Sequence, residues 1–265
     1  DFAQHLTVLR HQLKPKKLRL TTKVKRRIRW LIKHYWSPEQ IVRVCQQRQI
    51  QMVSIETIYR YLYQLKRKGI DYCKHLRRHH RKRRKRRLNN QPRQIIKNKV
   101  NISKRPKSAN NTSEIGLLEV DLMKCQNGYL LTLTDRKTLY NIIRKIKNKS
   151  SKAVEVALIK LKKYHPLIKT ITSDNGTEFT RHEQIAKRLK IDWYFADPYS
   201  PQQRGCNENQ NGLIRQYATR KTDLNLITEE QIIKWQTALN YRPRKKINFN
   251  KPIRIFKSNS VAFIN

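Results

Sequence analysis

The sequence predicts an all-α region over residues 1–71 followed by an α/β domain over 113–265, with a basic linker over 72–112 between them. In the first region, apolar residues recur three and four positions apart behind Ser and Thr caps, as in amphipathic helices. In the last region, strand-like runs joined by tight turns come first, and helical segments then alternate with strands. Between the two regions, Lys and Arg are too dense for a packed core.

Charge limits the choice of partner. The 265 residues include 61 Lys or Arg and 18 Asp or Glu, which gives a net charge of +43. Surface ion pairs cannot balance such an excess, so we expect a polyanion, and nucleic acid above all. No apolar run approaches the roughly 18 residues of a membrane-spanning helix, and no signal peptide opens the chain, so no membrane partner is expected.

The cysteines and the first residue add two expectations. The four cysteines are far apart and form no C-x-x-C pair, which argues against a zinc knuckle or a disulfide framework and fits a reducing cytoplasm. They are Cys45, Cys73, Cys125 and Cys206. The sequence begins with Asp1 rather than Met, so we expect that a piece of the N-terminus is missing.

Three helices are predicted in the first region, each behind a residue that can cap it. The caps and the helices they begin are Thr21 or Thr22 (to about 35), Ser37 (from 38) and Ser54 (55–66). The third helix is expected to expose a polar face, and the arrangement resembles a helix-turn-helix that contacts DNA. The residues on that face are Thr57, Arg60, Tyr61, Gln64 and Arg67. A small helical bundle without DNA contact is the alternative.

A basic run opens the predicted linker. Ten of the fourteen residues from Lys74 to Arg87 are Lys or Arg, so the segment repels itself and is expected to be disordered without a partner. On DNA it would neutralise phosphates without reading sequence, although a solvated tail or a localisation signal has the same composition. The phosphate contacts expected here include Arg77, Arg78, Arg81, Lys82, Arg83 and Arg84.

The α/β domain is predicted to begin with three strands joined by hairpins. They cover 115–123, 129–134 and 139–146, and Asn127-Gly128 forms the first turn. A helix capped by Ser150 or Ser151, a strand ending at Asp174, a helix over 182–189, a strand over 191–195 and a helix from Pro201 to about Ala218 follow. This order matches an RNase H-like α/β fold, in which the first strand lies beside the fourth.

Three carboxylates in this domain suggest a metal site. Asp121 lies in the first strand, Asp174 at the exit of the fourth, and Glu208 on the following long helix, so the fold can bring them together. Oxygen ligands suit Mg²⁺, and two such ions can activate an attacking oxygen and stabilise a leaving one. Glu119 shares a face with Asp121, and is either an outer-shell carboxylate or the partner of a nearby Arg. Asp135 is read as a turn residue.

Further arginines flank these elements. Arg204 and Arg215 lie on the helix of Glu208 and either hold phosphate or face solvent. A last helix is predicted behind Thr228, to about Asn240, and a basic loop follows it. That loop contains Arg242, Arg244 and Lys245.

Around Glu208 the chain resembles the transposases of the IS-thirty insertion-sequence family, a DDE group with an integrase-like core. Thirty-three residues separate Asp174 from Glu208. The segments that carry the resemblance are Ser37–Ile41, Glu56–Tyr61, Lys74–Arg78, Ser173–Gly176, Tyr194–Pro201, Arg204–Tyr217 and Asn240–Lys245. They span nearly the whole chain, and the family's catalytic Asp, Asp and Glu fall on Asp121, Asp174 and Glu208.

The resemblance implies a DNA transposase that uses two Mg²⁺ ions, with Mn²⁺ as a substitute. Such an enzyme binds the terminal inverted repeats of its element, nicks the ends and transfers the freed 3′-hydroxyl to target DNA. It also implies DNA contact by the loop at Arg242, at least a dimer that pairs two ends, and a place in the bacterial cytoplasm with the nucleoid. The alternatives are an RNase H-like nuclease that does not join strands, and a DNA-binding repressor without catalysis.

Overall fold

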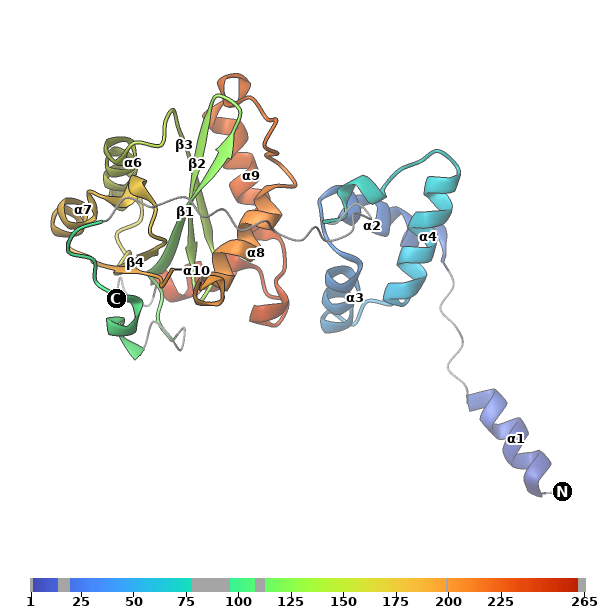
Figure 1. Cartoon of the computed structure of the whole chain (residues 1–265). Helices are drawn as coiled ribbons and strands as arrows, with labels where there is room; N and C mark the ends of the chain where they lie inside the picture. Colours follow the sequence, from blue (N-terminus) through green and yellow to red (C-terminus); the bar gives the residue numbers. More distant parts are fainter. Residues whose placement is uncertain (1, 14–19, 78–95, 108–112, 199, 262–265) are drawn as a thin grey trace. The chain divides into compact units, whose positions relative to one another are not determined.

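The computed structural model describes residues 2–13, 20–77, 96–107, 113–198 and 200–261 (Figure 1). The chain divides into two compact units, a helical unit over Asp1–Leu76 and an α/β unit over Arg77–Asn265. Within the described ranges, no helix combines the length and the apolar character that crossing a membrane requires.

The helical unit contains four α-helices. They are α1 (Phe2–Leu13), α2 (Thr22–Lys33), α3 (Pro38–Gln47) and α4 (Ile55–Arg67), and a 3-10 turn, Cys73–His75, follows. The three predicted caps are confirmed, because Thr21, Ser37 and Ser54 each accept a hydrogen bond from a main-chain N–H in the first turn. Ser37 also forms a capping box with Gln40. Local side-chain chemistry therefore sets where these helices begin.

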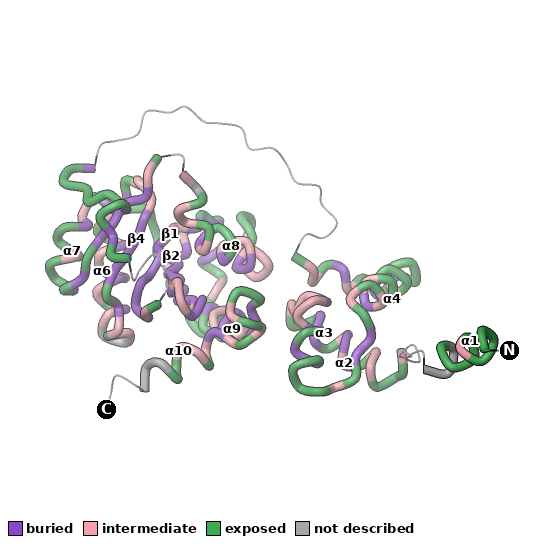
Figure 2. Tube along the Cα trace, turned by 90° about the horizontal axis from the view of Figure 1, so that it is seen from below, coloured by how far each residue is buried: buried purple, intermediate pink, exposed green. Residues whose placement is uncertain are grey.

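Helices α2, α3 and α4 share one core. Ile28, Ile41, Ile58 and Leu62 are fully or almost fully buried in it. The burial follows the helical repeat, because Ile58 and Leu62 are four residues apart on α4 and face the same way. In Figure 2 the buried segments of α2, α3 and α4 face one another and the outer turns are exposed.

A five-stranded sheet forms the centre of the α/β unit. Its strands are β1 (Leu117–Cys125), β2 (Gly128–Asp135), β3 (Asn141–Ile146), β4 (Thr170–Ser173) and β5 (Asp192–Phe195), in the order β3-β2-β1-β4-β5. The first three strands pair antiparallel, whereas β4 and β5 run parallel to β1. The predicted RNase H-like order is confirmed, with the first strand beside the fourth.

Helices cover both faces of this sheet. They are α6 (Ser151–Tyr164), α7 (His182–Leu189), α8 (Gly205–Ile214), α9 (Glu229–Tyr241) and α10 (Pro252–Val261). Leu118 and Val120 face the core that α6 and α7 complete, whereas Met123 and Cys125 face α8 and α9. Figures 1 and 2 show the sheet between these two layers. The alternation of β1 therefore sends its odd-numbered residues, Asp121 included, to the side of α8.

The helix expected from Pro201 to Ala218 is shorter and begins later. Pro201–Arg204 forms a 3-10 turn, and α8 covers only Gly205–Ile214. Ser200 makes no capping hydrogen bond, and Arg204 has φ −125° and ψ 29°, outside the helical region. This break places Arg204 at the start of α8.

Residues 96–107 lie within the span that the sequence predicted as linker, yet they pack on the α/β unit. Ile96 belongs to its core, and Phe195 donates its main-chain N–H to the oxygen of Val100. The buried guanidinium of Arg105 donates to Thr172 Oγ1 on β4 at 3.2 Å. The polar composition of the segment gave no sign of this packing, because two isoleucines, Ile96 and Ile102, and a few hydrogen bonds hold it.

Candidate active site

Asp121 and Asp174 lie on the same face of the sheet. The last pair in the β1–β4 register is Glu119 with Thr172, and each aspartate comes two residues later on its own strand or strand exit. A single guanidinium contacts both carboxylates. Arg204 Nη2 is 3.5 Å from Asp121 Oδ1, and Arg204 Nη1 is 3.3 Å from Asp174 Oδ2. The predicted pairing of the first and fourth strands therefore brings the two carboxylates close enough to contact the same guanidinium, that of Arg204.

Neighbouring polar groups orient the Asp121 carboxylate. Leu122 donates its N–H to Oδ1 at 3.0 Å, and Asn211 of α8 donates its amide to Oδ2 at 2.5 Å. Thr132 Oγ1 holds Asn211 in turn, at 3.2 Å from its Oδ1. Burial raises the pKa of the Asp121 carboxyl, Arg204 opposes that shift, and the Asp174 charge adds to it. The carboxylate is thus held in place where a cation favours its ionised form.

The turn after β4 sets the position of Asp174. Gly176 donates its N–H to Asp174 Oδ1 at 3.0 Å, and Asn175 donates its amide to the oxygen of Ala196 at 2.7 Å. Lys99 Nζ donates to Asn175 Oδ1 at 2.8 Å. A Cβ at Gly176 would lie 2.5 Å from the carboxyl carbon of Glu178, so only glycine fits this turn without movement. The side chain of Asp174 remains 46% exposed.

Glu208 is not brought into this group. It lies in the first turn of α8 with an exposed side chain, one turn from Asn211 on the same helix face. Among the residues that the structure describes, no three His, Cys, Asp or Glu side chains gather as metal ligands. The structure therefore places two of the three predicted ligands together and leaves the third beside them.

Glu119 is a buried structural carboxylate. Arg136 Nη1 lies 2.5 Å from its Oε1, and the main-chain N–H of Asn207 donates to its Oε2 at 2.9 Å. Of the two roles that the sequence left open, these contacts correspond to the pair with an Arg. Because Asn207 precedes Glu208, Glu119 fastens the first turn of α8 to the sheet.

The donor set at Asp121 and Asp174 fits a cation. Both contributors are carboxylates, which hard divalent cations prefer, and the Arg204 guanidinium already occupies the place of a positive charge between them. The Arg204 guanidinium thus lies between the two carboxylates and balances part of their charge.

The predicted DNA contacts on α4 differ in exposure. Arg60 and Gln64 are exposed, and Arg60 forms an ion pair with Glu56 at 3.1 Å. Thr57 is half-buried, with its hydroxyl 2.9 Å from that of Ser54. The prediction that Tyr61 is exposed is wrong, because its side chain is buried in the core of the helical unit. It lies three residues after Ile58, so the helical repeat turns it inward.

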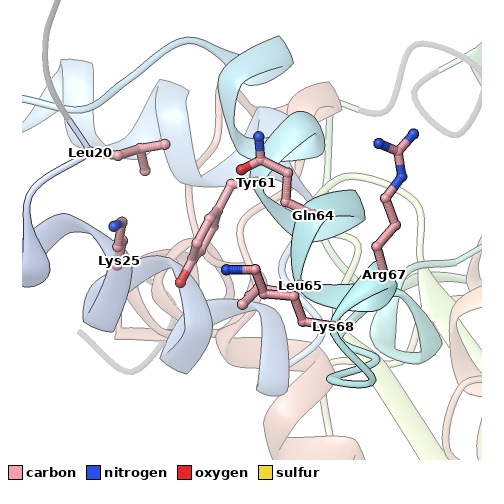
Figure 3. Close-up of a pocket in the computed structure, with 7 residues that line it drawn as sticks. All are labelled: Leu20, Lys25, Tyr61, Gln64, Leu65, Arg67 and Lys68. Atoms are coloured by element: carbon pink, nitrogen blue, oxygen red, sulfur yellow. The ribbon is translucent and has the colours of Figure 1, made fainter.

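A pocket beside α4 is lined by several polar side chains. Its volume is about 600 Å³. Its lining residues are Leu20, Lys25, Tyr61, Gln64, Leu65, Arg67 and Lys68 (Figure 3). In Figure 3, Leu20 and Lys25 face the α4 side chains across the pocket, with Tyr61 between them. Three of the residues expected to face DNA, Tyr61, Gln64 and Arg67, therefore line one basic depression.

Most of the basic run lies outside the described residues. Arg78, Arg81, Lys82, Arg83 and Arg84 belong to that part of the chain. Arg77 is described, and its guanidinium donates to the side-chain and main-chain oxygens of Asn209 at 2.7 and 3.4 Å. A Cβ at Gly212 would lie 2.6 Å from Arg77 Nη2, so the glycine makes room for this guanidinium.

The arginines after α9 are buried, whereas the sequence predicted an exposed basic loop. Arg242 donates to Gln216 Oε1 at 2.6 Å, and Arg244 donates to the oxygen of Leu239 at 2.9 Å. Both side chains are almost fully buried, and burial lowers their pKa values to about 10 and about 9. Lys245 is exposed. The two arginines therefore pack against the end of α9 and its surroundings, and of the three loop residues only Lys245 has an exposed side chain.

The contact of Arg204 with both carboxylates was not predicted as such. Sequence reasoning placed Arg204 among phosphate contacts or on a solvated helix face, but its side chain is only 13% exposed and contacts two carboxylates. Arg215 also points inward, donating to the oxygen of Lys124 at 3.0 Å. Asn211 orients Asp121. The three-residue spacing of Glu208 and Asn211 on α8 is the signal that could have placed these two residues on one face.

Comparisons with known proteins agree with this architecture. The integrase core domain family matches residues 111–201. The chain is 42% identical to the transposase for insertion sequence element IS4351 of Bacteroides fragilis, over 99% of this chain and 83% of that protein. It is 38% identical to the transposase InsI for insertion sequence element IS30C of Escherichia coli (strain K12), over 84% of this chain and 61% of that protein.

Solved structures similar to part of the chain include an integrase domain. It is the catalytic core domain of BIV integrase, with 19% identity and a TM-score of 0.46 over 56% of this chain and 97% of that one. The family match, together with the identity to these relatives over most of the chain, shows which family the chain belongs to. The chain belongs to the IS30 (IS-thirty) family of insertion-sequence transposases and contains an integrase core.

Proposed function

We propose that this transposase binds the terminal inverted repeats of its insertion sequence and uses Mg²⁺ to nick the ends and transfer them to target DNA. One observation carries the proposal: Asp121 and Asp174 hold their carboxylates around a single positive charge on one face of an integrase core. The proposed place of action is the bacterial cytoplasm, at the nucleoid.

The proposed ligands are Asp121, Asp174 and, after its side chain turns toward them, Glu208. Mg²⁺ ions bound there, or Mn²⁺ in their place, would activate the attacking oxygen and stabilise the leaving oxygen. Asn211 and Leu122 keep Asp121 oriented, and Gly176 does the same for Asp174. Glu119 positions the first turn of α8, from which Glu208 must reach. In the first proposed step, a water oxygen attacks the phosphorus at the element end, and the 3′-oxygen leaves as a free 3′-hydroxyl. In the second, that 3′-hydroxyl gives up its proton and its oxygen attacks a phosphorus of the target DNA, while the target strand's own 3′-oxygen leaves and takes a proton.

DNA recognition is assigned to the rest of the chain. The helical region over 1–71 is proposed to contact the inverted repeats through the exposed face of α4 and its basic depression. The basic run over 74–87 would neutralise phosphates. At least a dimer is proposed, because two ends must be paired before they are joined to one target.

A cleavage and joining assay tests the catalytic assignment. Labelled element-end DNA is incubated with the full chain and Mg²⁺, and the nick and any joined product are mapped. Asp121→Asn, Asp174→Asn and Glu208→Gln are each expected to reduce nicking at least about 100-fold, since metal-assisted stabilisation amounts to several kcal/mol. Glu183→Gln, an exposed carboxylate of α7, is the matched control and retains activity.

Each other outcome points to a different function. If all three variants nick the DNA as fast as the wild type does, these carboxylates do not form the site. Cleavage without any joined product favours the nuclease, and end binding without cleavage favours the repressor.

A further inference from the structure

We propose that Arg204 is an internal counter-ion that holds Asp121 and Asp174 together in the metal-free protein and must leave before a divalent cation binds. This inference rests on the proposed function, because it concerns the same two carboxylates. Arg204 contacts both aspartates, at 3.5 and 3.3 Å, and its Nη2 donates to the oxygen of Val120 at 2.7 Å. It is thus the cation that now balances the pair.

The contacts are of a kind that can be exchanged. Charge-assisted hydrogen bonds between nitrogen and oxygen measure about 2.7–2.9 Å, and both carboxylate contacts of Arg204 are longer. Within the described part of the chain, its buried Nε has no hydrogen-bond partner. The side chains of Asp121 and Asp174 are 26% and 46% exposed, so a cation from solvent can reach them. The contacts of the guanidinium with the two carboxylates are therefore longer than its 2.7 Å hydrogen bond to Val120, and they are the ones that a metal ion would replace.

The start of α8 couples the departure of Arg204 to the arrival of Glu208. Arg204 is the N-cap residue of α8, and Glu208 lies four residues later, in the first turn of that helix. Two aspartates with one guanidinium carry a net charge of minus one. Three carboxylates with one divalent cation carry the same charge, so exchanging Arg204 for Glu208 and a metal ion leaves the local balance unchanged.

Mn²⁺ binding measured by electron paramagnetic resonance tests this exchange on the full chain, without DNA. Arg204→Gln is expected to lower the Kd for Mn²⁺ about tenfold, because the competing cation is gone. Arg215→Gln is the matched control: it removes an equal charge on the same side of the sheet, from a side chain that bonds the main chain at Lys124. That variant is expected to change the Kd less than about twofold. Arg204→Lys, which keeps one charge but cannot bridge both carboxylates, is expected to fall between the wild type and Arg204→Gln.

The results separate this inference from the proposed function. Unchanged or weaker Mn²⁺ binding by Arg204→Gln overturns the counter-ion role, and so does equally tight binding by the Gln and Lys variants. If Asp121→Asn leaves all Mn²⁺ binding of the wild type and of Arg204→Gln intact, the metal is elsewhere and the proposed function fails instead.

Thermal unfolding gives a second readout, because the melting temperature can be measured first without metal and then with Mn²⁺. The metal-free Arg204→Gln protein is expected to melt at a lower temperature than the wild type, because the two aspartates then repel one another. Saturating Mn²⁺ is expected to raise the melting temperature of the variant more than that of the wild type, since it binds the variant more tightly. Equal shifts in both proteins contradict the proposal.

Discussion

Two carboxylate–arginine contacts lie two residues apart on one face of β1, and they differ in almost every other respect. Glu119 is 1% exposed, contacts Arg136 at 2.5 Å, and also accepts the N–H of Asn207. Asp121 is 26% exposed, contacts Arg204 at 3.5 Å, and shares that guanidinium with Asp174. The inner contact fastens α8 to the sheet, whereas the outer one is partly exposed at the proposed metal site.

Desolvation explains the difference. A buried charge that loses its partner cannot be rescued by water, so Glu119 and Arg136 must remain paired. Partly exposed carboxylates can exchange one cation for another at small cost, because solvent screens the intermediate arrangement. A carboxylate and an arginine therefore form a structural anchor where they are buried. We expect the same kinds of side chain to form an exchangeable site where the carboxylates are partly exposed.

The largest expected effect on stability comes from breaking the inner pair. Glu119→Gln leaves Arg136 without its counter-charge and weakens the bond to Asn207, so we expect a loss of about 3 kcal/mol in the free energy of unfolding. Urea denaturation followed by circular dichroism measures it. Glu114→Gln, which removes an exposed pair with Lys169, is the matched control and is expected to cost less than about 1 kcal/mol. Similar losses in the two variants would show that the inner pair is no anchor.

A smaller effect is expected at the outer site. Asp174→Asn removes a half-exposed carboxylate and its repulsion with Asp121, so the metal-free free energy of unfolding is expected to change by less than about 1 kcal/mol. The rise in melting temperature on adding Mn²⁺ is expected to disappear in the same variant. A large loss of stability without metal would make Asp174 a structural residue like Glu119.

Features fixed by local chemistry were predictable from the sequence. The caps at Thr21, Ser37, Ser54 and Thr228 were read correctly because each depends on a hydrogen bond within one turn. The juxtaposition of Asp121 and Asp174 followed from the order of strands, because a parallel crossover puts the fourth strand beside the first.

Side chains whose surroundings come from distant segments were not predictable in the same way. Arg242 and Arg244 read as a basic loop, yet the packing of α9 buries them. Arg204 read as a phosphate contact or a solvated residue, yet the break before α8 turns it between two carboxylates from other strands. Charge in a sequence thus indicates the kind of partner, but not whether that partner is DNA or the protein itself.

The smallest expected effect is in the response to salt. The loss of stability in metal-free Arg204→Gln is expected to shrink by about half in 1 M NaCl, where charges are screened over about 3 Å. The loss in Glu119→Gln is expected to change little, because its site is buried. Urea denaturation at low and high NaCl measures both. Equal salt responses would contradict the distinction between an inner and an outer pair.

The central claim is that Asp121 and Asp174 form the exchangeable cation site of the transposase. A crystal structure of the full chain soaked with Mn²⁺, with anomalous scattering recorded, tests it most directly. We predict an anomalous peak between the carboxylates of Asp121 and Asp174, with Arg204 displaced from both and the Glu119–Arg136 contact unchanged. A peak elsewhere, or Mn²⁺ bound while Arg204 still bridges the two aspartates, would contradict the account.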